Sequence, residues 1–462
     1  MMQRWARRET GWRDRDGLRL FASLALLLTT GGLHASSPVA ASQGGRFEGV
    51  ASCAGSTCHG RTEGDGKVVR QDELRVWQES SARSGAHSRA FAVLGSARAQ
   101  RIASALGLGN AASAPACLGC HATSAGQRGE RFLLSDGVGC ESCHGAASGW
   151  LASHYTVAAS HAGNVAQGMV PLENPQARAA VCLDCHFGSN KPNQFVSHRM
   201  MAAGHPRLTF ELDLFSALQQ HHDEDADYAR RKGRTDSVRL WAIGQTIAVR
   251  RSLSLFSNAG LATEGAFPEF TFYDCHSCHR PIDDQPDRKR TFETNPGRPI
   301  PLGMPPYNDE NIVMLSAVAQ ALAPGQAARF DAAARNFHGA MGAGRSQAVA
   351  AAGRLDAAAG ALAAAFGSGK GGDSAFSVIA ALSGRAISPR FTDYAGSAQA
   401  VMAVDTLLNA LVRQGRITVG AAAGIRAQVN RAYAAVGSPA SYNPAAFRAA
   451  LGEAARSIEA LR

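Results

Sequence analysis

The stretch Gly137-Val-Gly-Cys140-Glu-Ser-Cys143-His144-Gly145 contains two cysteines separated by two residues and followed at once by a histidine. The same arrangement of a cysteine pair and an adjacent histidine occurs five times, and it uses all ten cysteines of the chain. The five motifs are Cys53/Cys58/His59, Cys117/Cys120/His121, Cys140/Cys143/His144, Cys182/Cys185/His186 and Cys275/Cys278/His279. This pattern organises the chain around five equivalent sites.

The motif is typical of covalently attached haem c. Its two thiols add to the two vinyl groups of one haem, and the adjacent histidine becomes the proximal ligand of the iron. Structural disulfides, zinc knuckles and thioredoxin-like redox pairs do not require a histidine after the second cysteine. The chain has only 15 histidines, so their presence in all five motifs is not accidental. The sequence therefore predicts five haems c.

The first motif departs from the common spacing, because four residues separate Cys53 from Cys58. Gly55 supplies backbone freedom for the longer loop. The alternative for this pair is a disulfide between Cys53 and Cys58.

The sixth iron ligand decides between electron transfer and catalysis. Ten histidines lie outside the proximal positions; of these, His34 lies near the N-terminus and His276 lies between two haem-binding cysteines, which leaves eight for five irons. Gly204 and Pro206 predict a helix break that directs His198 and His205 to different haems. The favoured distal ligands are His87, His154, His198 and His205, with His221 and His161 competing for the fifth position, His222 and His338 behind them, and Met200 or Met201 as an alternative.

The N-terminus predicts export. Six arginines precede and flank the apolar stretch Leu20–Leu28, and small residues follow through Ala41, which indicates a signal peptide over residues 1–41. We expect a periplasmic or otherwise exported protein, the alternative being an anchor formed by an uncleaved signal. No later segment is expected to cross a bilayer.

The net charge does not favour nucleic-acid binding. The formal charge is +10, and removal of residues 1–41 takes away six Arg, two Asp and one Glu, which leaves +7. The propionate carboxylates of five haems outweigh this surplus and are natural partners for Lys and Arg side chains.

The predicted organisation is a pentahaem cytochrome c domain over residues 42–305 and a haem-free helical domain over residues 306–462. A capped helical pattern runs from Thr235 to Leu255, and Asn443-Pro444 begins another helix. The Ala-rich C-terminal part has no cysteine and indicates a helical bundle that covers the haem core or docks a partner.

Three segments together resemble the cytochrome c-554 type of multihaem cytochromes. They are the motif at Cys140, the segment from Trp77 through His87 to Ala90, and Ala-Ala-Gly-His205-Pro-Arg-Leu. The resemblance covers roughly residues 50–285. It implies a mainly α, loop-rich body organised around haems stacked in parallel and perpendicular pairs. These relatives carry four haems, and some keep one five-coordinate haem.

The sequence therefore predicts a carrier that moves electrons between other redox proteins, whose identities it leaves open along with the oligomeric state. The alternative is a haem oxidoreductase that acts on a small nitrogen or sulfur compound at a five-coordinate iron. No set of residues marks a catalytic site for such a reaction.

Overall fold

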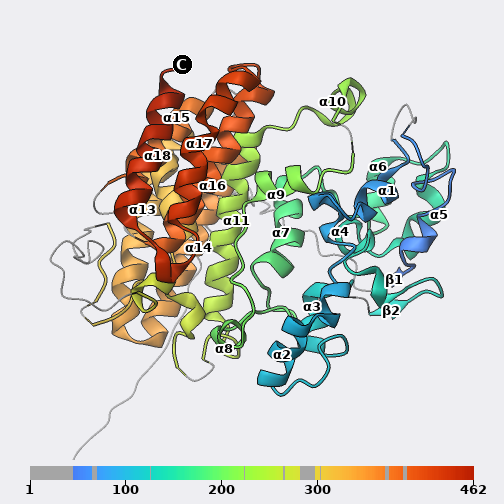
Figure 1. The fold of residues 1–462 in the computed structure, drawn as a ribbon, viewed down its shortest axis with the longest axis horizontal. Coiled ribbons are helices and arrows are strands. Elements are labelled where there is room, and N and C mark those ends of the chain that lie inside the picture. The colour runs from blue at the N-terminus through green and yellow to red at the C-terminus, as the bar shows by residue number, and fades with distance from the viewer. Residues whose placement is uncertain are drawn as a thin grey trace, which may run out of the picture. The chain divides into compact units, whose positions relative to one another are not determined.

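In the computed structural model the described residues are 45–64, 70–124, 126–222, 224–263, 266–280, 297–301, 303–369, 374–388 and 393–462. These parts of the chain are mainly helical, which confirms the predicted class (Figure 1). The predicted signal peptide, residues 1–41, lies outside them.

The helices up to residue 257 are mostly short and lie among long loops (Figure 1). They are α1 (Glu73–Gln78), α2 (Ala97–Ala105), α3 (Pro115–His121), α4 (Glu141–His144), α5 (Leu151–His154), α6 (His161–Ala166), α7 (Pro175–His186), α8 (His198–Ala202), α9 (Leu212–Leu218), α10 (Ala226–Lys232) and α11 (Ser237–Ser257). Two short strands, β1 (Arg46–Phe47) and β2 (Gln127–Arg128), pair in parallel.

Three cysteine motifs end a helix. The helices α3, α4 and α7 each have the motif histidine as their last residue. Two cysteines three positions apart lie on one face of a helical turn, so both thiols point to the same side. Asn174 caps α7 by accepting hydrogen bonds from two backbone N–H groups, and Pro175 occupies the first helical position.

The short-helix region has a small apolar interior. Within its described residues, buried apolar side chains form one cluster around Leu94, Ala103 and Ala111, and a second around Leu183 and Phe210. A compact segment of this length normally needs a larger apolar core. Additional apolar volume, which these side chains do not provide, is therefore needed to fill the interior.

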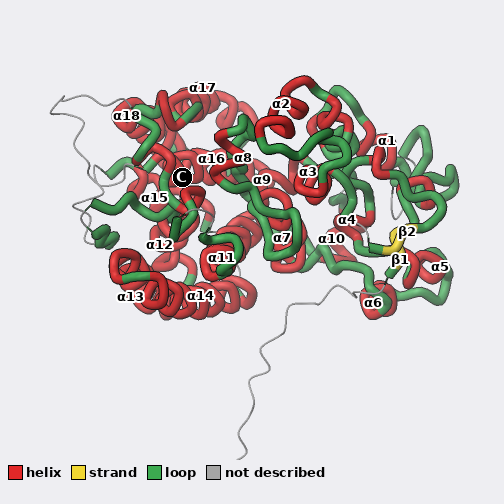
Figure 2. The backbone as a smooth tube through the Cα atoms, turned by 90° about the horizontal axis from the view of Figure 1, so that it is seen from below, coloured by secondary structure: helices red, strands yellow, loops and turns green. Residues whose placement is uncertain are grey.

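The long helices share one large core. After α11 they are α12 (Glu310–Leu322), α13 (Pro324–Ala340), α14 (Arg345–Ser368), α15 (Ala375–Ala386), α16 (Tyr394–Arg413), α17 (Val419–Ala435) and α18 (Pro444–Glu459). Trp241 and Phe256 of α11 are fully buried in this core together with Phe337, Leu355 and Val404. Figure 2 shows these helices packed beside one another.

The core begins before the fifth cysteine motif, because α11 precedes Cys275 and packs against α14 and α12. The predicted start of α11 is confirmed, since Asp236 caps it by accepting the Arg239 N–H. The predicted start of α18 is confirmed in the same way by Asn443. The domain boundary between residues 305 and 306 stays a prediction.

Two helices, Arg345–Ser368 and Tyr394–Arg413, are long and apolar enough to cross a membrane by length and composition alone. This corrects the expectation that no later segment passes that test. Of their apolar windows, 44% and 83% respectively are buried against the other helices. A core helix of a globular protein shows the same features, so neither helix is assigned to a membrane.

Buried polar contacts connect the two parts of the structure. Glu211 caps α9 and accepts a hydrogen bond from the Thr406 hydroxyl of α16 at 2.8 Å. Asp213 and Arg413 form an ion pair at 2.8 Å. Burial, with Asp213 nearby, raises the pKa of Glu211 to about 7. The folded protein therefore retains a proton there at pH values where the unfolded chain has lost it.

We expect this proton to make stability depend on pH. A raised carboxyl pKa contributes stability that is present below about pH 4.5 and is lost as the pH rises towards 7. Glu211→Gln should remove this part of the dependence, a difference on the order of 3 kcal/mol between pH 4 and pH 8. Urea unfolding at both pH values measures it, with the exposed Glu453→Gln as control. An unchanged pH dependence in the Glu211 variant would contradict the assignment.

Candidate haem-iron centres

The backbone of the motifs places each histidine next to its first cysteine. The N–H groups of His144 and His279 donate to the carbonyl oxygens of Cys140 and Cys275, at 3.0 and 2.8 Å. In the wider first motif the His59 N–H donates to the Cys53 carbonyl in the same way, at 3.1 Å. The extra residues form a tight loop and leave the histidine in the same relation to its first cysteine.

All ten cysteines are free thiols, including Cys53 and Cys58. They are available for thioether bonds to haem.

Each motif histidine has a second imidazole beside it. The ring centres lie 6.0–6.4 Å apart in every case, although the partners are distant in sequence. The pairs are His59 with His154 (6.4 Å), His121 with His205 (6.4 Å), His144 with His221 (6.3 Å) and His222 (6.2 Å), His186 with His87 (6.0 Å), and His279 with His198 (6.1 Å).

This spacing fits a metal ion between the rings. A metal–imidazole bond is about 2.0 Å long and the ring centre lies roughly 1 Å behind the nitrogen, so two imidazoles on opposite sides of one ion have centres about 6 Å apart. The recurrence of this separation at all five motifs is difficult to attribute to ordinary ring packing. The residues present therefore fit haem iron held between two histidines.

Hydrogen bonds at Nδ1 leave Nε2 available at several of these rings. A backbone carbonyl can only accept, so an Nδ1 beside one carries the proton and Nε2 keeps its lone pair. The contacts are His121 with Ala90 (2.9 Å), His154 with Leu151 (2.8 Å), His205 with Pro206 (2.8 Å) and His221 with Gln219 (2.9 Å). This is the tautomer that binds a metal through Nε2.

Burial keeps three of the paired imidazoles neutral. It lowers the pKa of His144 to about 3, with His221 and His222 adding to the effect. Burial likewise lowers the pKa of His186 and of His221 to about 4. A neutral imidazole is the form that ligates a metal.

Cysteines of different motifs lie beside one another. The Cys140 thiol and burial raise the pKa of Cys53, and the Cys185 thiol and burial raise that of Cys120. Burial, with both cysteines of the fourth motif nearby, raises the pKa of Cys143 to about 12. The third motif is therefore adjacent to the first and fourth, and the fourth is adjacent to the second.

The fifth motif lies against the C-terminal helices. Asp274 accepts a hydrogen bond from the Ala395 N–H of α16 at 3.3 Å, and His276 Nδ1 lies 2.9 Å from the Pro439 carbonyl. Arg207, close to Cys275, donates through Nη2 to Glu310 at 2.9 Å. Its Nη1 is buried and has no hydrogen-bond acceptor among the described residues. A haem propionate is an anion that such a group could bind.

The structure brings His87, His154, His198, His205 and His221 to motif histidines, but not His161. The ring of His161 is exposed, and its Nε2 lies 2.6 Å from Glu173 Oε1. His338 is buried beside Asp309, with 3.0 Å between Nε2 and Oδ2.

The helix break predicted at His205 is present, because α8 ends at Ala202 and Gly204 has a φ of +111°. His87 lies between two short 3-10 turns, Arg83–Ala86 and Ala92–Gly95.

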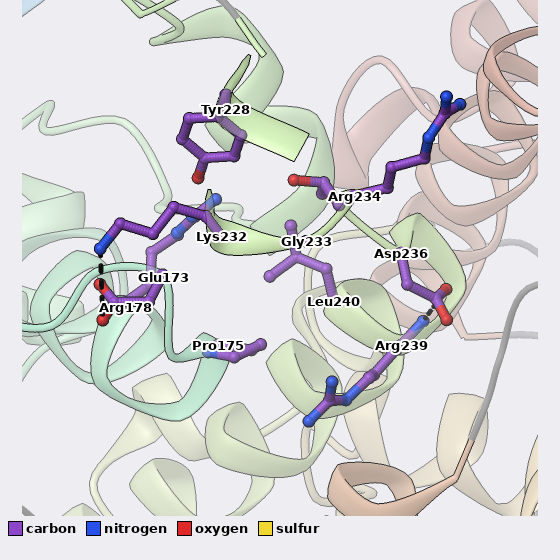
Figure 3. Close-up of a pocket in the computed structure, with 11 residues that line it drawn as sticks. Glu173, Pro175, Arg178, Tyr228, Lys232, Gly233, Arg234, Asp236, Arg239 and Leu240 are labelled. Atoms are coloured by element: carbon purple, nitrogen blue, oxygen red, sulfur yellow. Dashed lines mark hydrogen bonds and ion pairs between the residues drawn. The ribbon is translucent and has the colours of Figure 1, made fainter. Parts of the chain in front are cut away.

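Glu173 also lines a polar pocket between α7, α10 and α11 (Figure 3). Three of its basic side chains have partners within the chain: Lys232 lies 3.9 Å from Glu173, Arg178 donates to the Leu172 carbonyl and Arg239 to that of Gly367. The lining residues include no histidine or cysteine, so the pocket adds no iron ligand.

Sequence reasoning missed Glu73. This buried carboxylate accepts from His59 Nδ1 at 3.0 Å and lies 3.6 Å from His222 Nδ1. It thus contacts imidazoles of two centres. Its position on α1, 14 residues after His59, gives no local pattern that would have revealed this.

Comparison with known proteins supports the predicted resemblance. Residues 52–145 match the family described as cytochrome c554 and c-prime, a range that contains the first three cysteine motifs. Neither the curated proteins nor the solved structures give a match. The sequence of residues 52–145 is therefore similar to that of c-type cytochromes of the c554 type.

Proposed function

We propose that the protein is a periplasmic multihaem cytochrome that carries electrons between redox partners through five covalently bound haems c. The observation that supports this most strongly is the second imidazole about 6 Å from every motif histidine. Two histidines on one iron fill both axial positions and leave no place for a substrate.

The proposed ligands follow from these pairs. The proximal ligands are His59, His121, His144, His186 and His279, and the distal ligands in the same order are His154, His205, His221 or His222, His87 and His198. The ten motif cysteines supply the thioether bonds. The bound haems would supply one-electron redox chemistry, while the protein fixes their spacing, ligands and exposure.

The contacts between motifs support a continuous path. They connect the centres in the order first, third, fourth and second. The fifth follows through α8 and the turn after it, because His198 and His205 are seven residues apart and pair with His279 and His121. We propose that electrons travel along this series.

Export and partners complete the proposal. The arginine-rich, apolar N-terminus supports cleavage near Ala41 and delivery to the periplasm. The partners would be other redox proteins rather than nucleic acid, since the propionates of five haems balance the excess of basic side chains.

The number of haems is measured by the mass of the mature protein. We expect the polypeptide plus five haems, with the fifth lost in a variant carrying both Cys275→Ser and Cys278→Ser. A wild-type mass with four haems, unchanged in this variant, would contradict haem attachment at the fifth motif. The same substitutions at Cys53 and Cys58 test the first motif independently.

Replacement of one distal ligand should alter one haem. His87→Met should change the spectrum of a single haem and raise its potential by on the order of 100 mV, because thioether ligation favours the reduced iron. The control is His161→Met, which changes a histidine outside the pairs and should leave spectrum and potentials as in the wild type. Equal spectra for the two variants would refute the assignment of His87.

An electron paramagnetic resonance spectrum of the oxidised protein distinguishes a carrier from an enzyme. Six-coordinate irons with two histidines should give only low-spin signals. A stoichiometric high-spin signal would show an open iron and would favour the alternative, a haem oxidoreductase acting on a small nitrogen or sulfur compound.

A further inference from the structure

The centre at His144 differs from the other four because two imidazoles face its proximal histidine. The ring centres of His221 and His222 lie 6.3 and 6.2 Å from that of His144, at interplanar angles of 87° and 86°. One ring nitrogen from each of His144, His221 and His222 could bind a metal, and these three nitrogens lie within 4.8 Å of one another. Distance and orientation thus favour neither imidazole.

Only one of them can occupy the sixth position at a time. Both face the same side of the iron, where there is room for one ring. Their ring centres are 4.2 Å apart, so a small movement is enough to exchange one imidazole for the other. They follow α9 directly, in a loop outside any helix, so exchange requires no helix to unwind.

The two imidazoles have different neighbours at Nδ1. His221 Nδ1 lies 2.9 Å from the carbonyl oxygen of Gln219, a neutral acceptor. His222 Nδ1 lies 3.6 Å from Glu73 Oε1, an anionic acceptor. A carboxylate partner makes an imidazole a stronger electron donor to a metal than a carbonyl partner does. The state with His222 bound should therefore favour oxidised iron more strongly.

Glu73 connects this choice to a second centre. Its Oε2 accepts from Nδ1 of His59, the motif histidine of the first centre, at 3.0 Å. The Glu73 side chain is only 7% exposed, so solvent does not easily replace either contact. Movement of His222 changes the partners of the carboxylate that orients His59.

We propose that His221 and His222 are alternative sixth ligands of the iron bound at His144, and that the His222-bound state is coupled to His59 through Glu73. This inference rests on the proposed haem ligation. It gives the third centre, which contacts both the first and the fourth, two states of different potential.

Single and double replacements test the proposal. His221→Ala and His222→Ala should each retain a low-spin third haem, because the remaining imidazole takes the position. The double variant should gain one high-spin signal, and added imidazole should restore the low-spin form, which would also show that the protein is folded. His161→Ala serves as the control for loss of a histidine outside the centres.

The midpoint potential of the third haem in the two single variants tests the role of Glu73. The third haem should have a lower midpoint potential in His221→Ala, where His222 is the ligand, than in His222→Ala. A tenfold difference in the reduction equilibrium corresponds to 59 mV for one electron. Glu73→Gln should reduce that difference, since it removes the anionic acceptor.

Some outcomes would overturn the inference. A high-spin signal in either single variant would show that one histidine is the sole ligand, and equal potentials of the third haem in the two single variants would show that Glu73 does not distinguish the two states. After either outcome, the proposed carrier function would still stand if the wild-type protein contains five haems and gives only low-spin signals. Failure of that function would appear separately, as missing haem in the wild-type mass.

Discussion

The distance of about 6 Å between the ring centres of paired imidazoles is the constraint on which the proposed haem-binding region depends. Each pair joins segments far apart in the chain, such as His59 with His154 and His87 with His186. A haem iron bound between them would act as a cross-link, and the attached porphyrin would supply apolar bulk. This would explain how the described residues between 45 and 232 form a defined structure although their side chains contribute only small apolar clusters. Under the proposed ligation, folding of this region and haem attachment are parts of one process.

The acceptors at Nδ1 differ from one centre to the next. Backbone carbonyls hold Nδ1 of His121, His154 and His205, whereas a carboxylate holds His59. Since the group that accepts from Nδ1 tunes the basicity of a ligating imidazole, identical axial ligands need not give identical potentials. A series of centres with the same ligand type can in this way acquire a gradient without any change in the ligands themselves.

The cysteine motifs were predictable because their chemistry is local. Thiols and proximal histidine lie within five to seven residues, so spacing alone defines the site. The resemblance to the c554 type is confirmed over residues 52–145, and the mainly helical class that it implied is confirmed as well. Distal pairing depends on tertiary structure: neither His161 nor His222 lies in a cysteine motif, yet one contacts Glu173 and the other faces His144. The contact of Glu73 with two centres likewise has no sequence signal.

The C-terminal helices do more than cover the haem region, because their core extends into it. Helix α11 lies between the fourth and fifth motifs in sequence and is buried among α12, α14 and α16. Tyr307 and the helices after it belong to the same core, and Tyr307 forms an isolated antiparallel β-bridge with Tyr273, just before the fifth motif. From the C-terminal helices, the Ala395 N–H donates to Asp274, and the Pro439 carbonyl lies beside His276. The fifth motif is thus held against the C-terminal helices, whereas the other four motifs lie among the short helices that precede α11.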